Sequence, residues 1–298
     1  MSELRFDGKV AVVTGAGHGL GRSHAILLAE RGAKVVVNDL GGALDGTGAS
    51  TGPAAEVVEL IAKNGGEAVA NADNVATPEG AEAIVQTARD AFGRVDIVVN
   101  NAGILRDKSL GKMAVEEFDA VLAVHVRGSF LVSRAAFPHM KEQGYGRIVN
   151  TSSPAGLFGN FGQANYSTAK MGLVGLTKTL GIEGARAGIK ANAIAPIAWT
   201  RMTESLLPAE FEQRFTADRV SPLVAFLAHE SCPTSGEVFS VGAGRVARVF
   251  VAEGPGWRTD DLTIEAIRDN WEAILAEEPY VRPTTLGEQA AASMKAML

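Results

Sequence analysis

A tyrosine and a lysine four residues apart form the pair in this sequence best suited to acid–base chemistry. Tyr166 and Lys170 belong to the segment Tyr-Ser-Thr-Ala-Lys, and this spacing places both side chains on one face of a helix. A free tyrosine has a pKa of about 10, and a neighbouring ammonium group favours the phenolate. A phenol tuned in this way can exchange a proton at working pH. Because the same spacing also occurs in surface pairs, its meaning depends on the residues around it.

A hydroxyl group lies at a second position that suits this chemistry. Ser153 ends a Thr-Ser-Ser segment that directly follows an apolar run and precedes Tyr166 by thirteen residues. A hydroxyl at the carboxyl end of a strand can donate a hydrogen bond to a substrate oxygen on which negative charge develops. Ser153, Tyr166 and Lys170 together predict proton transfer to or from a substrate oxygen.

A glycine-rich turn near the N-terminus predicts a dinucleotide site. Residues 14–21 read Thr-Gly-Ala-Gly-His-Gly-Leu-Gly and lie between an apolar run and a helical pattern. Glycines let the backbone approach a pyrophosphate, and the N-terminus of the following helix offers free N–H groups and a positive dipole. This order of strand, turn and helix is the context that a dinucleotide site requires.

An acidic residue at the end of the second apolar run predicts the identity of the cofactor. Asp39 follows Gly21 by eighteen residues, and a carboxylate in that position can accept the ribose hydroxyls of NAD. It would repel the 2′-phosphate of NADP by about 4 kcal/mol at ~4 Å. NAD is therefore expected. The alternative is that Asp39 only caps a turn.

The composition excludes several classes of protein. The 298 residues carry a modest net charge of −6 and a single cysteine, Cys232. They contain no block of like charges that would suit a nucleic acid and no stretch of about 20 apolar residues. One cysteine cannot form an intramolecular disulfide or supply a structural zinc site. We expect a cytoplasmic protein with no metal, no nucleic-acid partner and no membrane partner.

Short β-branched runs alternate with amphipathic segments along most of the chain. The seven runs lie at residues 10–14, 34–38, 67–71, 97–100, 147–150, 190–195 and 237–241. Strands that alternate with helices predict an α/β fold, here a Rossmann-like, doubly wound sheet of seven parallel strands with helices on both faces. Ligands bind such sheets at the carboxyl ends of the strands.

Two segments fall outside this alternation. The glycine-rich residues 40–53 predict a flexible loop, or a mere connector, after the second strand. We expect residues 1–244 to form the main domain and residues 245–298 a C-terminal helical extension packed on it. The extension carries an apolar stripe on a helix starting near Thr263, and a second helix with Thr285 and Glu288 in a capping box. The stripe consists of Ile264, Ile267, Trp271 and Ile274.

The motifs together resemble the short-chain dehydrogenase/reductase family across residues 6–244. The match includes the glycine turn, Asn-Asn-Ala-Gly at residues 100–103, Ser153, the Tyr166/Lys170 pair and Pro196. The resemblance implies that Ser153 polarises the substrate, Tyr166 exchanges the proton, and Lys170 lowers the Tyr166 pKa and holds the nicotinamide ribose. The cofactor contacts that it implies are Gly15, Gly19, Leu20, Gly21, Asp39, Asp73, Asn74, Val75, Asn101, Ala102, Gly103, Tyr166, Lys170, Pro196, Ile197 and Thr200.

One position departs from that family. His125 stands where the family usually has an asparagine that helps to hold a water molecule in the proton relay. We include His125 among the candidate catalytic residues. A backbone carbonyl at a local helix irregularity could hold the same water, and His125 could instead be a packed helix residue.

The sequence, including His125, also resembles a narrower group, the (3R)-hydroxyacyl-CoA dehydrogenase units of peroxisomal multifunctional (D-bifunctional) type 2 proteins. Shared segments include residues 36–42, 101–107, 125–130 and 159–166. This resemblance implies a stand-alone, homodimeric or homotetrameric enzyme that oxidises an acyl thioester with NAD. Alternatives are a steroid or other hydrophobic-alcohol dehydrogenase, an NADPH-dependent 3-oxoacyl reductase and a non-catalytic NAD(H)-sensing regulator.

An apolar segment after Pro196 would suit a lid over an acyl chain, or ordinary core packing. Its apolar residues are Met202, Leu206, Leu207, Phe211 and Phe215.

Overall fold

The chain forms two compact units in the computed structural model, Met1–Arg248 and Val249–Leu298. The structure describes residues 3–203, 210 and 212–295. The first unit contains the sheet and the residues predicted to do chemistry. Each unit is described by itself below.

The first unit is built on one sheet with the strand order β3-β2-β1-β4-β5-β6-β7-β8. The strands are β1 (Val10–Thr14), β2 (Lys34–Asn38), β3 (Ala68–Asn71), β4 (Ile97–Asn100), β5 (Gly146–Thr151), β6 (Ile189–Pro196), β7 (Val238–Gly242) and β8 (Arg245–Val249). Every neighbouring pair from β3 to β7 is parallel. The predicted doubly wound parallel sheet is confirmed, with its seven predicted strands within a residue or so of their expected bounds.

The eighth strand was not predicted. A two-residue turn joins β7 to β8, and both of its residues, Ala243 and Gly244, have a positive φ (49° and 83°). This is the backbone that a tight hairpin requires, so β8 runs back beside β7. Residues 245–249 read Arg-Val-Ala-Arg-Val, which is a weak strand signal because it contains no continuous apolar run; β8 lies at the sheet edge and is mostly exposed.

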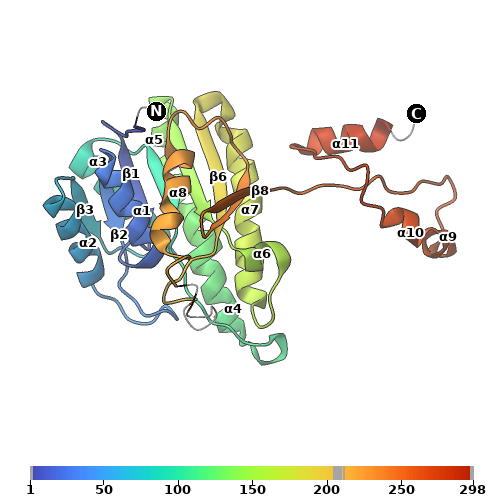
Figure 1. The fold of residues 1–298 in the computed structure, drawn as a ribbon, viewed down its shortest axis with the longest axis horizontal. Helices are drawn as coiled ribbons and strands as arrows, with labels where there is room; N and C mark the ends of the chain where they lie inside the picture. Colours follow the sequence, from blue (N-terminus) through green and yellow to red (C-terminus); the bar gives the residue numbers. More distant parts are fainter. Residues whose placement is uncertain (1–2, 204–209, 211, 296–298) are drawn as a thin grey trace. The chain divides into compact units, whose positions relative to one another are not determined.

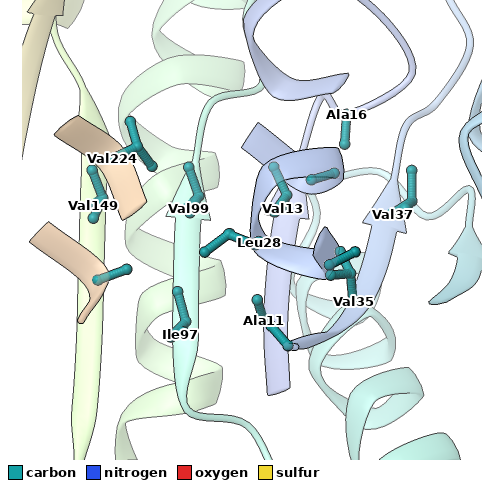
Figure 2. Close-up of a cluster of buried hydrophobic side chains, with 14 of the residues drawn as sticks. Ala11, Val13, Ala16, Leu28, Val35, Val37, Ile97, Val99, Val149 and Val224 are labelled. Atoms are coloured by element: carbon teal, nitrogen blue, oxygen red, sulfur yellow. The ribbon is translucent and has the colours of Figure 1, made fainter. Parts of the chain in front are cut away.

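Successive residues of the central strands point to opposite faces of the sheet, and each face is covered by helices (Figure 1). On one face, Ala11 and Val13 of β1 contact a core that includes Leu28 of α1 (Gly19–Glu30) and Val224 of α8 (Ser221–Ala228) (Figure 2). Helix α2 (Gly52–Lys63) adds to this face. The intervening residues of β1 face the second core. This two-sided burial explains why the strands are continuous apolar runs.

The opposite face is covered by α3 (Pro78–Phe92), α5 (Gly128–Gln143) and α7 (Ala164–Gly184). Helix α4 (Val115–Leu122) continues into α5 through a π-helical segment at Ala123–Arg127. The combined helix Val115–Gln143 has the length and apolar content of a membrane span. However, Leu131, Val132 and Met140 of this helix are buried against the sheet, as expected of a core helix.

The second unit contains three short helices, α9 (Ile264–Asp269), α10 (Trp271–Ile274) and α11 (Leu286–Lys295). Thr263 caps α9, and the helix expected to continue to Trp271 is interrupted at Asn270. Thr285 caps α11 as predicted, but Glu288 binds the backbone and hydroxyl of Thr284 instead of completing a box with Thr285.

The apolar stripe of the extension is only partly covered, with Ile267 and Ile274 half-buried. Ile264 is 83% exposed and Trp271 is 53% exposed. Burial of such side chains would contribute about 1.5 to 3 kcal/mol each. That the extension packs on the main domain stays a prediction.

Candidate active site

The parallel register brings a row of polar residues to one edge of the sheet. Thr14 of β1 pairs with Asn38 of β2, and Asn100 of β4 pairs with Asn150 of β5. The Asn100 amide donates to the Asn150 side chain (2.8 Å), which in turn donates to Thr177 of α7 (2.9 Å). These buried amides link the ends of β4 and β5 to α7, and so help to position the loops that carry the candidate site, although the Asn100 Oδ1 atom has no partner among the described residues.

Tyr166 and Lys170 lie on one face of α7, as predicted. The Lys170 ammonium is 5.4 Å from the centroid of the Tyr166 ring, and it donates to the Thr151 carbonyl at the end of β5 (2.6 Å). Lys170 is only 3% exposed. The pair is therefore a buried site and not a solvated surface pair.

Ser153 joins this pair from the loop after β5. It precedes the short helix α6 (Pro154–Phe158), and its hydroxyl accepts from the backbone N–H of Ala155 (3.2 Å). The same side chain hydrogen-bonds to the Tyr166 phenol. The structure thus brings the three predicted side chains together, with two hydroxyl groups meeting at one point.

Burial changes the acid–base properties of both titratable groups in this cluster. It raises the pKa of Tyr166 to about 12, an effect that the hydrogen bond from Ser153 opposes and the nearby carboxylate of Asp107 reinforces. Burial also lowers the pKa of Lys170 to about 7. The spacing of Tyr166 and Lys170 predicts that the ammonium lowers the Tyr166 pKa. Here desolvation is the larger effect, since it disfavours the charged form of each group.

His125 lies in the π-helical segment, so the helix irregularity anticipated from the sequence is present. Its ring is 1% exposed and contacts the Tyr166 ring edge-to-face, with centroids 5.3 Å apart. The Nε2 atom lies 2.9 Å from the Ile104 carbonyl and 3.1 Å from the Ile104 N–H, while Nδ1 has no hydrogen-bond partner among the described residues. Burial, aided by Lys170, keeps the pKa of His125 well below its usual value. The imidazole is therefore neutral and braces both Ile104 and Tyr166.

The backbone carbonyl of His125 is already engaged. It accepts from the Ser129 hydroxyl (2.6 Å), while the Gly128 N–H reaches back to Ala123 in the π-helical pattern. A water molecule at this carbonyl would share it with the Ser129 hydroxyl.

The glycine turn and Asp39 form the opposite end of the site. Gly15 has a positive φ of 63°, and a Cβ atom there would lie 2.7 Å from Ala102 Cα. The Asp39 carboxylate accepts from the backbone N–H of Gly17 (2.7 Å) and of Gly41 (2.7 Å). Both contacts are made by backbone groups. They hold the carboxylate at the end of β2, beside the turn where a pyrophosphate would bind.

A cavity of about 370 Å³ opens between these strand ends. It is lined by eleven of the residues that the resemblance assigned to the cofactor: Gly15, Gly19, Leu20, Asp39, Asp73, Asn74, Val75, Asn101, Ala102, Gly103 and Thr200. This lining fits a nicotinamide dinucleotide, since it combines backbone N–H groups, the Asp39 carboxylate at the end of β2 and close approaches that only glycine allows. When bound, the nicotinamide ring would supply the hydride acceptor.

Other predicted residues contribute around that cavity. Gly21 permits close packing of α1 on the turn, because a Cβ atom there would lie 2.2 Å from the Gly15 carbonyl. The Asn101 amide donates to the carbonyls of Thr14 and Gly15 (3.0 Å each). Pro196 ends β6, and Ile197 follows it, bonded to β7 through the Val241 carbonyl (2.9 Å). Gly21, Ser153, Tyr166, Lys170, Pro196 and Ile197 do not line the cavity.

Sequence reasoning missed part of the cavity wall. Arg106, Leu44 and Gly46 line it, and the latter two belong to the glycine-rich loop after Asp39. The length and glycine content of that loop were the available signal. Of the proposed lid, Met202 lines the cavity and Phe215 binds the Trp199 N–H through its carbonyl. Leu206, Leu207 and Phe211 lie outside the described residues.

Known proteins resemble this chain over most of its length. The family described as short chain dehydrogenase matches residues 9–210. Peroxisomal multifunctional enzyme type 2 of Mus musculus is 51% identical over 96% of this chain, which spans 39% of that longer protein. A hydroxyacyl-CoA dehydrogenase of Mycobacterium tuberculosis is 41% identical, with 92% of each chain covered.

A solved structure agrees with the fold. The crystal structure of a short chain dehydrogenase from Mycobacterium avium has a TM-score of 0.81 and 43% identity, covering 92% of this chain and 98% of that one. The family match includes the glycine turn after β1, Ser153 after β5, and Tyr166 and Lys170 on α7. The chain therefore belongs to the short-chain dehydrogenase family and is an oxidoreductase that acts on a CH–OH group with a nicotinamide cofactor.

Proposed function

We propose that this enzyme oxidises a (3R)-3-hydroxyacyl thioester, most simply the coenzyme A ester, to the 3-oxoacyl thioester with NAD. The observation that carries the alcohol chemistry is the buried meeting of Ser153, Tyr166 and Lys170 beside the dinucleotide cavity. The thioester class is supported by the hydroxyacyl-CoA dehydrogenase that aligns with 92% of both chains.

The proposed reaction divides between cofactor and protein. The nicotinamide cofactor, when bound, would supply the acceptor for the hydride that leaves C3 of the substrate. Tyr166, as the phenolate, takes the proton from the 3-hydroxyl group, and the Ser153 hydroxyl donates a hydrogen bond to the same oxygen. Lys170 stabilises the phenolate when the lysine amine is protonated. The neutral His125 ring holds Tyr166 in place. In the reverse reaction Tyr166 returns the proton.

NAD in preference to NADP is the second part of the proposal. Its support is Asp39, whose carboxylate is fixed by two backbone N–H groups at the end of β2. A 2′-phosphate at this ribose would meet an oriented negative charge.

A four-way rate comparison tests the proposal. Initial rates of NADH or NADPH formation are measured with (3R)- and (3S)-3-hydroxyacyl-CoA, each with NAD and with NADP. We expect turnover of the 3R ester with NAD at a kcat/KM at least about 100-fold above the other combinations. Equal use of both cofactors would reject the role of Asp39, and preference for the 3S ester would reject the substrate assignment.

The alternatives separate in the same assay. A steroid or other hydrophobic-alcohol dehydrogenase would turn over its alcohol in preference to the thioester, and a 3-oxoacyl reductase would prefer NADPH. A non-catalytic regulator would bind NADH without turnover. The assembled Ser153, Tyr166 and Lys170 cluster favours an enzyme.

We also propose a homo-oligomer. Phe130 of α5 and Met171 and Ile182 of α7 are 47%, 43% and 56% exposed, respectively, on neighbouring helices. Such apolar groups suit an interface between copies of the chain. Light scattering after size exclusion measures the assembly, and a monomer at assay concentration would contradict this.

A further inference from the structure

The glycine-rich segment after β2 is a closed loop with its own internal structure. We refer to residues 40–50 as the strap. At its neck the Ser50 N–H donates to the Leu40 carbonyl (2.9 Å). Gly41 has a φ of 71°, and a Cβ atom there would lie 1.9 Å from the Ser50 carbonyl oxygen. The two ends of the strap therefore meet, which is the arrangement of an Ω-loop.

The tip of the strap is shaped by Asp45. Its carboxylate accepts from the backbone N–H (2.9 Å) and the hydroxyl (2.7 Å) of Thr47. Ala43 accepts from the Gly46 N–H (3.0 Å) and donates to the Thr47 carbonyl (2.8 Å). Asp45 is exposed and does not line the cavity. It therefore gives the tip a fixed shape without facing the cofactor.

The tip is attached to the segment that follows β4. The Leu105 N–H donates to the Leu44 carbonyl (2.9 Å), and Arg106 Nε donates to the Asp45 carbonyl (2.9 Å). A Cβ atom on Gly46 would lie 3.1 Å from the Ile104 side chain. These contacts join residues about 60 positions apart in the sequence.

The attachment carries the strap across the cofactor cleft. The strap leaves the carboxyl end of β2 and reaches the segment after β4, and β1, which ends in the glycine turn, lies between those strands. Strap residues Leu40, Ala43 and Leu44 line the same cavity as the glycine turn. A dinucleotide on that turn would lie beneath the strap.

The far side of this attachment is firmly held. Ile104 is bound by His125, and the Arg106 carbonyl accepts from the amide of Asn165, the residue before Tyr166 (2.9 Å). Asn165 is fully buried. The strap, by contrast, is exposed along much of its length, and among the described residues its tip is attached by two hydrogen bonds and by the close approach of Gly46 to Ile104. If the strap tip separates from residues 104–106, we therefore expect the strap to move and residues 104–106 to stay in place.

We propose that the strap is a latch that retains the nicotinamide dinucleotide, and that its tip must detach from residues 104–106 for the cofactor to exchange. Leu40, Ala43, Leu44 and Arg106 thereby become cofactor-site residues, in addition to the glycine turn and Asp39. This inference rests on nicotinamide cofactor binding and does not depend on the acyl substrate.

A reversible cross-link tests whether the tip must open. The Gly46 Cβ position lies 3.7 Å from Ile104 Cβ, which is close to the usual spacing of about 3.8 Å in a disulfide. The double variant Gly46→Cys/Ile104→Cys adds two thiols to a chain whose single cysteine, Cys232, is buried. The protein is loaded with NADH, divided and kept oxidised or reduced. Excess NAD is then added, and the release of NADH is measured as the loss of the fluorescence of bound NADH.

We expect release from the oxidised protein to be at least about tenfold slower than from the reduced protein. Since both samples share the same substitutions, strain from the positive φ at position 46 affects them equally. Equal release rates would overturn the proposal. So would failure of the disulfide to form in a folded protein, because the tip and Ile104 would then not meet in solution.

A single substitution tests the latch from the other direction. Asp45→Ala removes the bonds that shape the tip, and we expect NADH release about three- to tenfold faster than from the native protein. Ser50→Ala is the matched control, because its hydroxyl accepts from the Gly52 N–H (3.2 Å), away from the tip. Unchanged release in Asp45→Ala would contradict the latch. Absence of NADH binding to the native protein would instead contradict the proposed cofactor.

Discussion

The two ends of the site use different parts of the chain. At the proton-transfer end, side chains do the chemistry, and burial moves the pKa of Tyr166 to about 12 and that of Lys170 to about 7. At the cofactor end, the site is shaped by backbone groups and by glycines. Two backbone N–H groups hold Asp39, and a Cβ atom on Gly15 or Gly21 would clash with neighbouring backbone. Substitutions at the proton-transfer end should therefore affect kcat, and substitutions at the cofactor end should affect the affinity for the dinucleotide and the choice between NAD and NADP.

The largest effect is expected for Tyr166→Phe. Loss of the proton-transferring hydroxyl should lower kcat by about 10³- to 10⁴-fold, while the Kd for NADH changes by less than about threefold, since the phenol does not line the cavity. Steady-state rates and NADH fluorescence titration measure the two quantities. Tyr145→Phe is the control, because that hydroxyl binds the Ala228 carbonyl. Substantial turnover by Tyr166→Phe would remove Tyr166 from the mechanism.

Ser153→Ala should lower kcat by about 10²-fold, the effect of removing one donor to a developing oxyanion. The Ser153 hydrogen bond lowers the Tyr166 pKa. Its loss should therefore also move the rising limb of the pH–rate profile for alcohol oxidation to higher pH. Ser153→Thr keeps the hydroxyl and is expected to retain more activity. A profile that does not move in Ser153→Ala would show that the two hydroxyls act independently.

At the cofactor end, Asp39→Ala should narrow the preference for NAD over NADP by about tenfold or more, through relief of charge repulsion. The ratio of kcat/KM for the two cofactors measures this. Asp39→Asn keeps one acceptor but removes the charge, so it separates repulsion from hydrogen bonding. If Asp39→Ala leaves the ratio unchanged, specificity arises elsewhere in the cavity.

The smallest effect concerns stability. Burial lowers the folded-state pKa of Lys170 from 10.5 to about 7, so the unfolded chain binds more protons between these values and stability should rise with pH across this window. Lys170→Met removes the buried amine. We expect it to increase the free energy of unfolding by about 1 kcal/mol or more at pH 6, with the gain shrinking toward pH 10. Urea unfolding at several pH values measures this.

The exposed Lys63→Met variant should show no comparable pH-dependent gain. A gain in Lys170→Met that is the same at every pH would mean that packing, and not charge burial, explains it.

The sequence predicts the elements that depend on local patterns. The apolar runs define the strands of the sheet, and the Tyr166/Lys170 spacing defines one helix face. What it could not supply depends on contacts between distant residues. The sign of the Tyr166 pKa change follows from burial by the folded chain, and the contact between Asp45 and Arg106 joins two separate loops. The eighth strand escaped prediction because an edge strand needs no apolar run.

We expect Tyr166 to become a usable base only when the cofactor binds beside it, because the surroundings of Tyr166 raise its pKa. The chain has three tyrosines, so the tyrosinate absorbance of the native protein minus that of Tyr166→Phe reports Tyr166 alone. We predict almost no signal below about pH 10 without NAD, and a titration that begins at least about two pH units lower with NAD bound, through the positive nicotinamide ring. Identical titrations with and without NAD would show that the bound cofactor does not lower the Tyr166 pKa.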